Sequence, residues 1–189
     1  MDRDADRKAV LWVAAGAALW GTDTVFRAPL AQALTPIHIV LYEHLILAVI
    51  VLPILIRRRR SLADISPRGW LAVLGISWIG SAAATVAFTY AIQSGNPTTA
   101  VLLQKLQPLF AIILARSLLK ERWASRFPLI ALAGIAGAYL ISFGGGNLLE
   151  PFAAVAPGPA ALATLAALGW GSSTVLGRCG WPQKFHSTC

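Results

Sequence analysis

Residues 98–119 read TTAVLLQKLQPLFAIILARSLL, a largely apolar stretch that holds one lysine, Lys105, within it. A helix needs about 20 mostly apolar residues to cross the hydrocarbon core of a bilayer, because each residue adds only about 1.5 Å. Five further stretches meet or approach this length: 9–26, 36–56, 70–92, 127–143 and 159–177. We therefore predict an all-α integral membrane protein, a polytopic helix bundle that crosses the lipid six times.

The composition agrees with lipid as the solvent of this chain. Hydrophobic residues make up 57% of the 189 residues and charged residues only 13%, against roughly 25% charged in an average soluble domain. The stretches are too long for the strands of a membrane barrel and do not alternate polar with apolar side chains. The first stretch shows no clear cleavage site, so we expect a retained helix rather than a signal peptide.

The basic residues flank the apolar stretches rather than forming a surface for nucleic acid. The formal net charge is +8, and four consecutive arginines occupy positions 57–60. The strongly basic segments lie before the first crossing or after the second, fourth and sixth crossings, so all of them are on one side of the membrane. Cytoplasmic loops carry the excess of lysine and arginine. This pattern predicts a cytoplasmic segment 1–8, a multi-pass protein of the plasma or inner membrane, contact with lipid head groups and no nucleic-acid partner.

A short motif recurs in the first and sixth stretches. Residues 20–25 read WGTDTV and residues 170–175 read WGSSTV. Five crossings separate the two copies, so the second copy would run through the membrane in the opposite direction. Inverted repeats of this kind are typical of secondary transporters, which bind their substrate near the midplane between the two units. The stretch 144–158, rich in glycine and proline, is the expected extracytoplasmic linker between them.

Several segments resemble the EamA domain, the repeat unit of the drug/metabolite transporter superfamily. They are, in order, the Trp-Gly of residues 20–21, Pro97, LLQKLQPLF at 102–110, KER at 120–122 and GIAGAYL at 134–140. The resemblance implies one five-helix repeat over 9–143 and the first helix of a second, inverted repeat at 159–177. It also implies a secondary transporter that exports small organic metabolites or drugs, built in this family from ten helices.

The end of the chain departs from that pattern. Residues 178–189 contain neither an apolar run nor segments typical of the family. We therefore expect an atypical cytoplasmic tail and a product cut short after the sixth helix. A non-transporting membrane remnant or scaffold stays open as the alternative function, and a homodimer is one way to bring two units together.

Three charged residues lie inside the predicted helices: Asp23, Glu43 and Lys105. Charged groups within the bilayer are costly and usually face a cavity, an ion or a counter-charge. At 1.5 Å per residue, Asp23 lies about 5 Å and the other two roughly 10 Å from the outer boundary. Either carboxylate would then neutralise Lys105 as a structural ion pair, or all three line an outward cavity. Glu43 is the candidate for proton coupling, and Lys105 is the candidate for an anionic group on the substrate.

Other polar and aromatic side chains complete the candidate site. Gln104 and Gln107, three residues apart, either bind substrate or bridge helices, and Trp20 would stack on a planar ligand. His44 follows Glu43 directly, so we expect it to point elsewhere and predict no His–Glu relay.

Two prolines, Pro53 and Pro108, lie inside predicted helices. Each lacks the amide hydrogen that the helical ladder requires, so each predicts a kink.

We predict no enzymatic activity, no cofactor and no metal site. Cys179 and Cys189 form no spacing typical of metal ligands. Six helices would also suit an intramembrane serine protease, but the segment GISW at 75–78 lacks the glycine that follows the nucleophile there. A serine without an activating base is a weak nucleophile, and no histidine is suitably placed.

Overall fold

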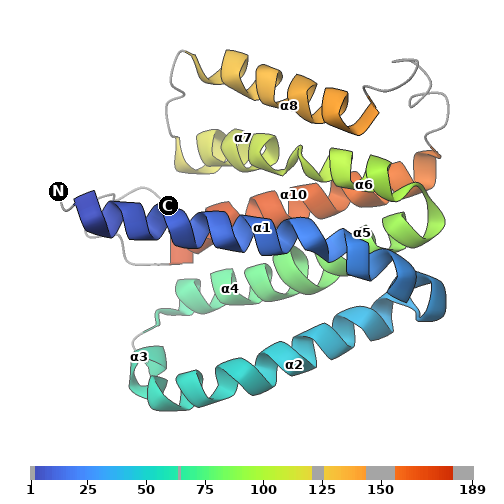
Figure 1. The fold of residues 1–189 in the computed structure, drawn as a ribbon. Helices are drawn as coiled ribbons and strands as arrows, with labels where there is room; N and C mark the ends of the chain where they lie inside the picture. Colours follow the sequence, from blue (N-terminus) through green and yellow to red (C-terminus); the bar gives the residue numbers. More distant parts are fainter. Residues whose placement is uncertain (1–2, 64, 121–125, 144–155, 181–189) are drawn as a thin grey trace.

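The computed structural model describes residues 3–63, 65–120, 126–143 and 156–180, and these form helices joined by short turns, with no strand among them. The long helices lie side by side with their ends at two opposite faces of the bundle (Figure 1). Four helical segments are long and apolar enough to cross a membrane: Pro36–Arg57, Pro67–Ser94, Pro97–Leu119 and Pro157–Arg178. The prediction of an all-helical, polytopic membrane protein is confirmed.

The first two helices join through a tight turn. α1 spans Arg3–Ala33 and therefore continues past the end predicted at residue 26. α2 spans Pro36–Arg57 and begins where Thr35 caps its first turn, with Pro36 in a position that needs no amide hydrogen. Pro53 lies inside α2, which is continuous through it. A short helix, α3 (Arg59–Ala63), follows in the basic loop.

The third apolar stretch is one continuous helical segment with a change of winding in its middle. It consists of α4 (Pro67–Gly75), the π-helix η1 (Ile76–Ala83) and α5 (Ala84–Ser94). π-Helical turns are rare and occur frequently at functional sites. The side chains of η1 are therefore candidates for a functional role.

The fourth stretch is divided into two helices at the predicted substrate-binding lysine. α6 (Pro97–Gln104) and α7 (Gln107–Leu119) are separated by Lys105 and Leu106. The amides of Lys105 and Leu106 bond three residues back rather than four, to the carbonyls of Leu102 and Leu103. Pro108, which cannot donate to a carbonyl four residues earlier, lies just after this break.

The last long helix occupies the middle of the bundle. α10 (Pro157–Gly180) passes behind α1, between α7 and α4, whereas α8 (Phe127–Phe143) lies at the edge (Figure 1). Small residues permit the close approach that helix association in lipid requires. A Cβ on Gly171 would lie 2.9 Å from the carbonyl oxygen of Gln107, and one on Gly169 would lie 2.9 Å from Cβ of Ala84.

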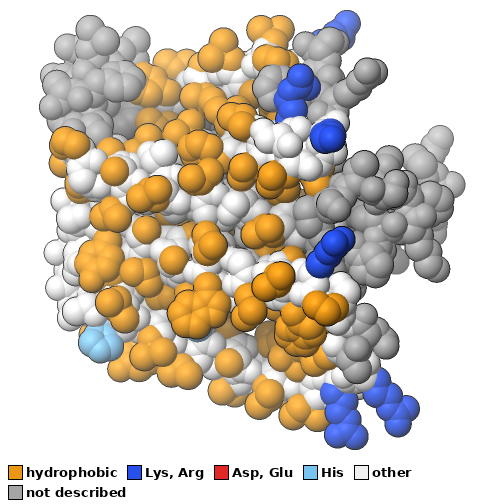
Figure 2. All heavy atoms as spheres, turned by 180° about the vertical axis from the view of Figure 1, so that it is seen from behind, with side chains coloured by type: hydrophobic (Ala, Val, Ile, Leu, Met, Phe, Trp, Pro, Cys, Tyr) orange, Lys and Arg blue, Asp and Glu red, His pale blue; other side chains and the backbone are white. Residues whose placement is uncertain are grey.

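The outer surface of the bundle suits a lipid environment. Hydrophobic side chains cover most of the face seen from behind, and lysine and arginine gather at one end of the helices (Figure 2). The buried core is small and consists mainly of alanines around Phe88 and Ile92. Most of the predicted linker and of the predicted tail lies outside the described residues.

Candidate functional site

A buried arginine organises the charged residues of the bundle. The Nε and one terminal nitrogen of Arg27 bind the two carboxylate oxygens of Asp23, each at 2.8 Å. The same terminal nitrogen donates to Glu43 at 2.7 Å, and the other donates to the hydroxyl of Thr89 at 2.9 Å. Arg27 thereby connects α1, α2 and α5.

The local structure explains why this cluster forms. Asp23 and Arg27 are four residues apart on α1, the spacing at which side chains of one helix meet. α1 continues to Ala33, so Arg27 lies within the helix and turns inward rather than flanking the membrane. Thr89 accepts from Arg27 and donates its own hydrogen to the carbonyl of Thr85, which satisfies both sides of its hydroxyl.

A cavity of about 400 Å³ opens beside this cluster. Arg27 is only 6% exposed, whereas the side chains of Asp23 and Glu43 are 32% and 36% exposed. The guanidinium is thus buried behind two carboxylates that face the cavity. The described residues that line it are Leu19, Trp20, Asp23, Arg27, Glu43, His44, Leu47, Ser81, Thr85, Phe88, Gln104 and Trp170.

The two copies of the repeated Trp-Gly motif meet at this cavity. The rings of Trp20 and Trp170 are 6.1 Å apart and nearly perpendicular, at 83°. Phe88 extends the aromatic wall, with its ring 5.2 Å from that of Trp170. α1 and α10, which carry the two tryptophans, run in opposite directions (Figure 1).

His44 belongs to the same site, contrary to our expectation. Its Nδ1 lies 2.8 Å from the carbonyl oxygen of Val40, and its Nε2 lies 3.0 Å from the hydroxyl of Ser81. A carbonyl oxygen only accepts, so Nδ1 carries the hydrogen, and in the neutral ring Nε2 accepts from Ser81. Ser81 is on η1, so this bond ties the π-helix to α2. Adjacent residues on a helix point about 100° apart, and the cavity is wide enough to contact both Glu43 and His44.

Lys105 has a different environment from the one we expected. The ion pairs of Asp23 and Glu43 are made with Arg27, not with Lys105. Lys105 is exposed at the break between α6 and α7, and none of the described carboxylates forms an ion pair with it. Of the two alternatives for Lys105, the described residues show neither an ion pair with a carboxylate nor a place in the lining of the larger cavity, because sequence depth alone does not specify which helices are neighbours.

The two glutamines are separated by the same break. Gln104 is buried, at 8% exposure, and lines the cavity. Gln107 begins α7 and is half-buried outside the lining, although its carbonyl oxygen packs against Gly171. Of the predicted site residues, the cavity therefore brings together Trp20, Asp23, Glu43 and Gln104. Sequence reasoning missed Arg27 and His44, and the Asp23–Arg27 spacing was the available signal for the former.

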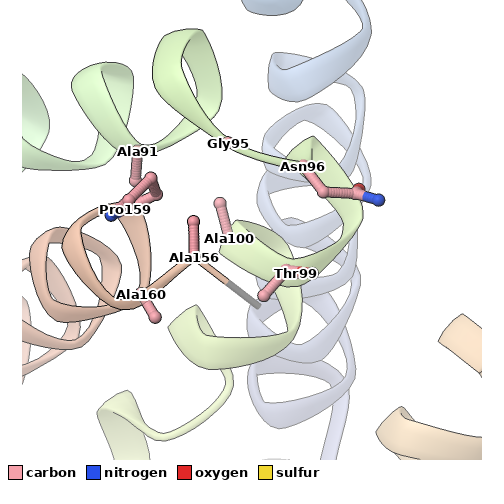
Figure 3. A pocket seen from close by; sticks show the side chains of 8 residues that line it. All are labelled: Ala91, Gly95, Asn96, Thr99, Ala100, Ala156, Pro159 and Ala160. Carbon is pink, nitrogen blue, oxygen red and sulfur yellow. The ribbon is translucent and has the colours of Figure 1, made fainter. Parts of the chain in front are cut away.

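A second, smaller cavity lies at the turn between α5 and α6. It measures about 230 Å³, and small side chains from three helices surround it (Figure 3). Asn96 and Thr99 are the polar residues among its described lining, which carries no charge. It offers little to orient a polar solute, so we place the candidate site in the larger cavity. No cluster of three potential metal ligands occurs among the described residues.

This chain is similar to a known protein family and to a known protein. The model of a family described as the EamA-like transporter family matches residues 7–143. The riboflavin transporter ImpX of Fusobacterium nucleatum subsp. nucleatum is 32% identical over 185 residues, covering 90% of this chain and 58% of that protein. The chain therefore spans less than two thirds of that relative's length. No solved structure matches it.

Proposed function

Because this chain belongs to the EamA-like transporter family, we propose that it is a secondary transporter that exports a small organic molecule through the cell membrane. The basic ends of the helices favour a cytoplasmic N-terminus. The family and the relative are both described as transporters rather than enzymes.

The observation that carries this proposal is the cavity lined by residues of α1, α2, η1, α5, α6 and α10. Its volume of about 400 Å³ falls within the roughly 300–1,000 Å³ usual for small-molecule sites. Trp20, Trp170 and Phe88 contribute aromatic rings to the lining, and the Arg27 cluster contributes charged groups. Apolar walls with a few polar groups are what a binding site for an organic solute requires.

A planar aromatic solute fits this division of the lining. The similar protein from Fusobacterium is named a riboflavin transporter, and riboflavin combines a flat ring system with a polar side chain. Tryptophan rings provide a large apolar surface for such a ring. The polar groups of the lining would then hydrogen-bond the edge of the solute.

Glu43 is our candidate for coupling transport to protons. Its carboxylate faces the cavity and is held by Arg27 at 2.7 Å, and intramembrane carboxyls commonly relay protons. Protonation of Glu43 would weaken its bond to Arg27 and hence the link between α1 and α2. Proton binding would thereby act on the packing of the helices around the solute.

A binding and flux experiment tests the proposal. The full chain is reconstituted in liposomes, and riboflavin binding and movement are followed by flavin fluorescence with and without a pH gradient. We expect Trp20→Ala or Trp170→Ala to weaken binding by about tenfold or more, since stacking and ring burial contribute about 1–2 kcal/mol. Glu43→Gln should remove the dependence of flux on the pH gradient.

The matched control is Trp78→Phe. Trp78 is 70% exposed and does not belong to the described lining of the cavity, so its replacement should leave riboflavin binding unchanged. Binding that responds equally to all three tryptophan variants would place the solute elsewhere. Wild-type protein that neither binds nor moves riboflavin or other planar aromatic solutes would favour the scaffold alternative.

A further inference from the structure

We propose that the cavity selects its solutes by charge: it accepts planar aromatic molecules that are cationic or present N–H donors, and it rejects those carrying phosphate or carboxylate. This inference rests on the transport function proposed above. It names the class of substrate that the site takes.

The charges of the described lining do not cancel. Asp23 and Glu43 contribute two negative charges, and Arg27 contributes one positive charge. We count His44 as neutral, with Nδ1 donating to the carbonyl of Val40 and the hydroxyl of Ser81 donating to Nε2. The cluster therefore has one net negative charge in surroundings of low dielectric, where charges act over longer distances than in water.

Arg27 is not available to an anionic solute. Its four hydrogen bonds to Asp23, Glu43 and Thr89 use four of the five N–H groups that a guanidinium offers. It is also only 6% exposed. A phosphate in the cavity would face two carboxylates that are about one third exposed and a guanidinium that is almost fully buried.

Lys105 does not supply the missing positive charge. It is exposed and does not belong to the described lining of the cavity. The two carboxylates of the lining are acceptors, and one Glu43 oxygen does not bind Arg27. N–H or O–H groups of a solute would donate hydrogen bonds to these carboxylate oxygens, whereas an anionic solute would be repelled by them.

The aromatic wall adds to the same preference. Trp20 and Trp170 lie edge to face, so the face of at least one ring is directed away from its partner. The face of an indole carries negative electrostatic potential and attracts cations. A planar cation would therefore be attracted both by the indole rings and by the carboxylates of the lining.

The test compares three fluorescent planar probes of different charge. Riboflavin is neutral, its 5′-phosphate is anionic and proflavine is cationic, and each is titrated into the purified full chain in detergent. We expect riboflavin to bind about tenfold or more tightly than its phosphate, because two added charges are repelled across roughly 10 Å. Proflavine should bind at least as tightly as riboflavin.

Neutralising one carboxylate separates charge from size. Glu43→Gln should reduce the preference for riboflavin over its phosphate to less than about threefold, since the cluster is then neutral. Asp23→Asn makes the same change on α1 and serves as a second variant if the first is poorly folded. Asp6→Asn is the matched control, because it alters the same charge on the same helix about 25 Å away.

The outcomes distinguish this inference from the transport function. If riboflavin and its phosphate bind equally well, or if both carboxylate variants keep the wild-type preference, charge selection is overturned while solute binding stands. If none of the three probes binds the wild-type chain, the proposed binding site itself fails, and the charge selection fails with it.

Discussion

The sharpest test of the structure is the replacement Arg27→Met. Methionine preserves most of the side-chain volume but removes the guanidinium and its four hydrogen bonds. Two carboxylates then face each other across α1 and α2 with no described positive charge between them. If the structure is correct, this single change destabilises the contact among three helices.

The magnitude follows from the burial of the partners. Removing one member of a buried ion pair typically costs about 3–5 kcal/mol, because the other charge is left uncompensated. Asp23 and Glu43 are 32% and 36% exposed, so water offsets part of that loss and we expect about 2–3 kcal/mol. For a chain of this length the midpoint of thermal unfolding should fall by roughly 5–10 °C.

The assay is thermal unfolding of the purified chain in detergent, with the double variant Arg27→Met/Glu43→Gln beside the single one. Removing the unpaired Glu43 carboxylate in the double variant should recover at least about 1 kcal/mol of the lost free energy of unfolding. Lys105→Met is the control and should change the stability by no more than about 0.5 kcal/mol, because Lys105 is exposed. The reasoning is refuted if Lys105→Met is the damaging change and Arg27→Met is neutral.

Three further predictions concern packing, the π-helix and orientation. Gly171→Leu should lower the stability by about 1–3 kcal/mol in the same thermal assay, since its side chain would enter the backbone of α7; an unchanged midpoint would contradict the close approach of α10. Ser81→Ala should weaken solute binding, because the hydroxyl of Ser81 bonds His44. Ser77→Ala, on the same π-helix, should leave solute binding unchanged. Equal effects of the two variants in binding titrations would show that His44 does not contribute to the site. Reporters fused after Arg60 should be active in the cytoplasm and those fused after Asn96 outside it, and the reverse pattern would overturn the orientation.

The helices were largely predictable because bilayer thickness fixes their length. The stretches predicted at 36–56 and 127–143 correspond to α2 (Pro36–Arg57) and α8 (Phe127–Phe143) within one residue at each end. α2 is bounded by clear signals: a capping threonine and a proline at its start, and arginines at its end. α1 was predicted too short because the first apolar stretch ends at residue 26, whereas Arg27 pairs with Asp23 within the helix.

The sequence predicted which residues line the candidate site better than it predicted which of them form ion pairs. Trp20, Asp23, Glu43 and Gln104 all line the cavity, since intramembrane polar groups converge on polar space. The partner of Glu43 was not predictable, because depth along a helix says nothing about which neighbour it faces. Only the packing of α1 against α2 and α5 brings Arg27, rather than Lys105, to that carboxylate.

The uneven burial of α2 has a mechanical consequence. Its buried residues, Pro36, Ile39 and Val40, are all near its start, and every side chain from Leu45 to Arg57 is exposed. α2 is thus packed against other helices near its start, where Glu43 and His44 make their bonds. Beyond these two residues it extends for about 20 Å with exposed side chains. A tilt of about 10° at that pivot would move its far end by roughly 3 Å. Proton or solute exchange at Glu43, as proposed above, would act next to this pivot, so a small local change there would be converted into movement of the far end of α2.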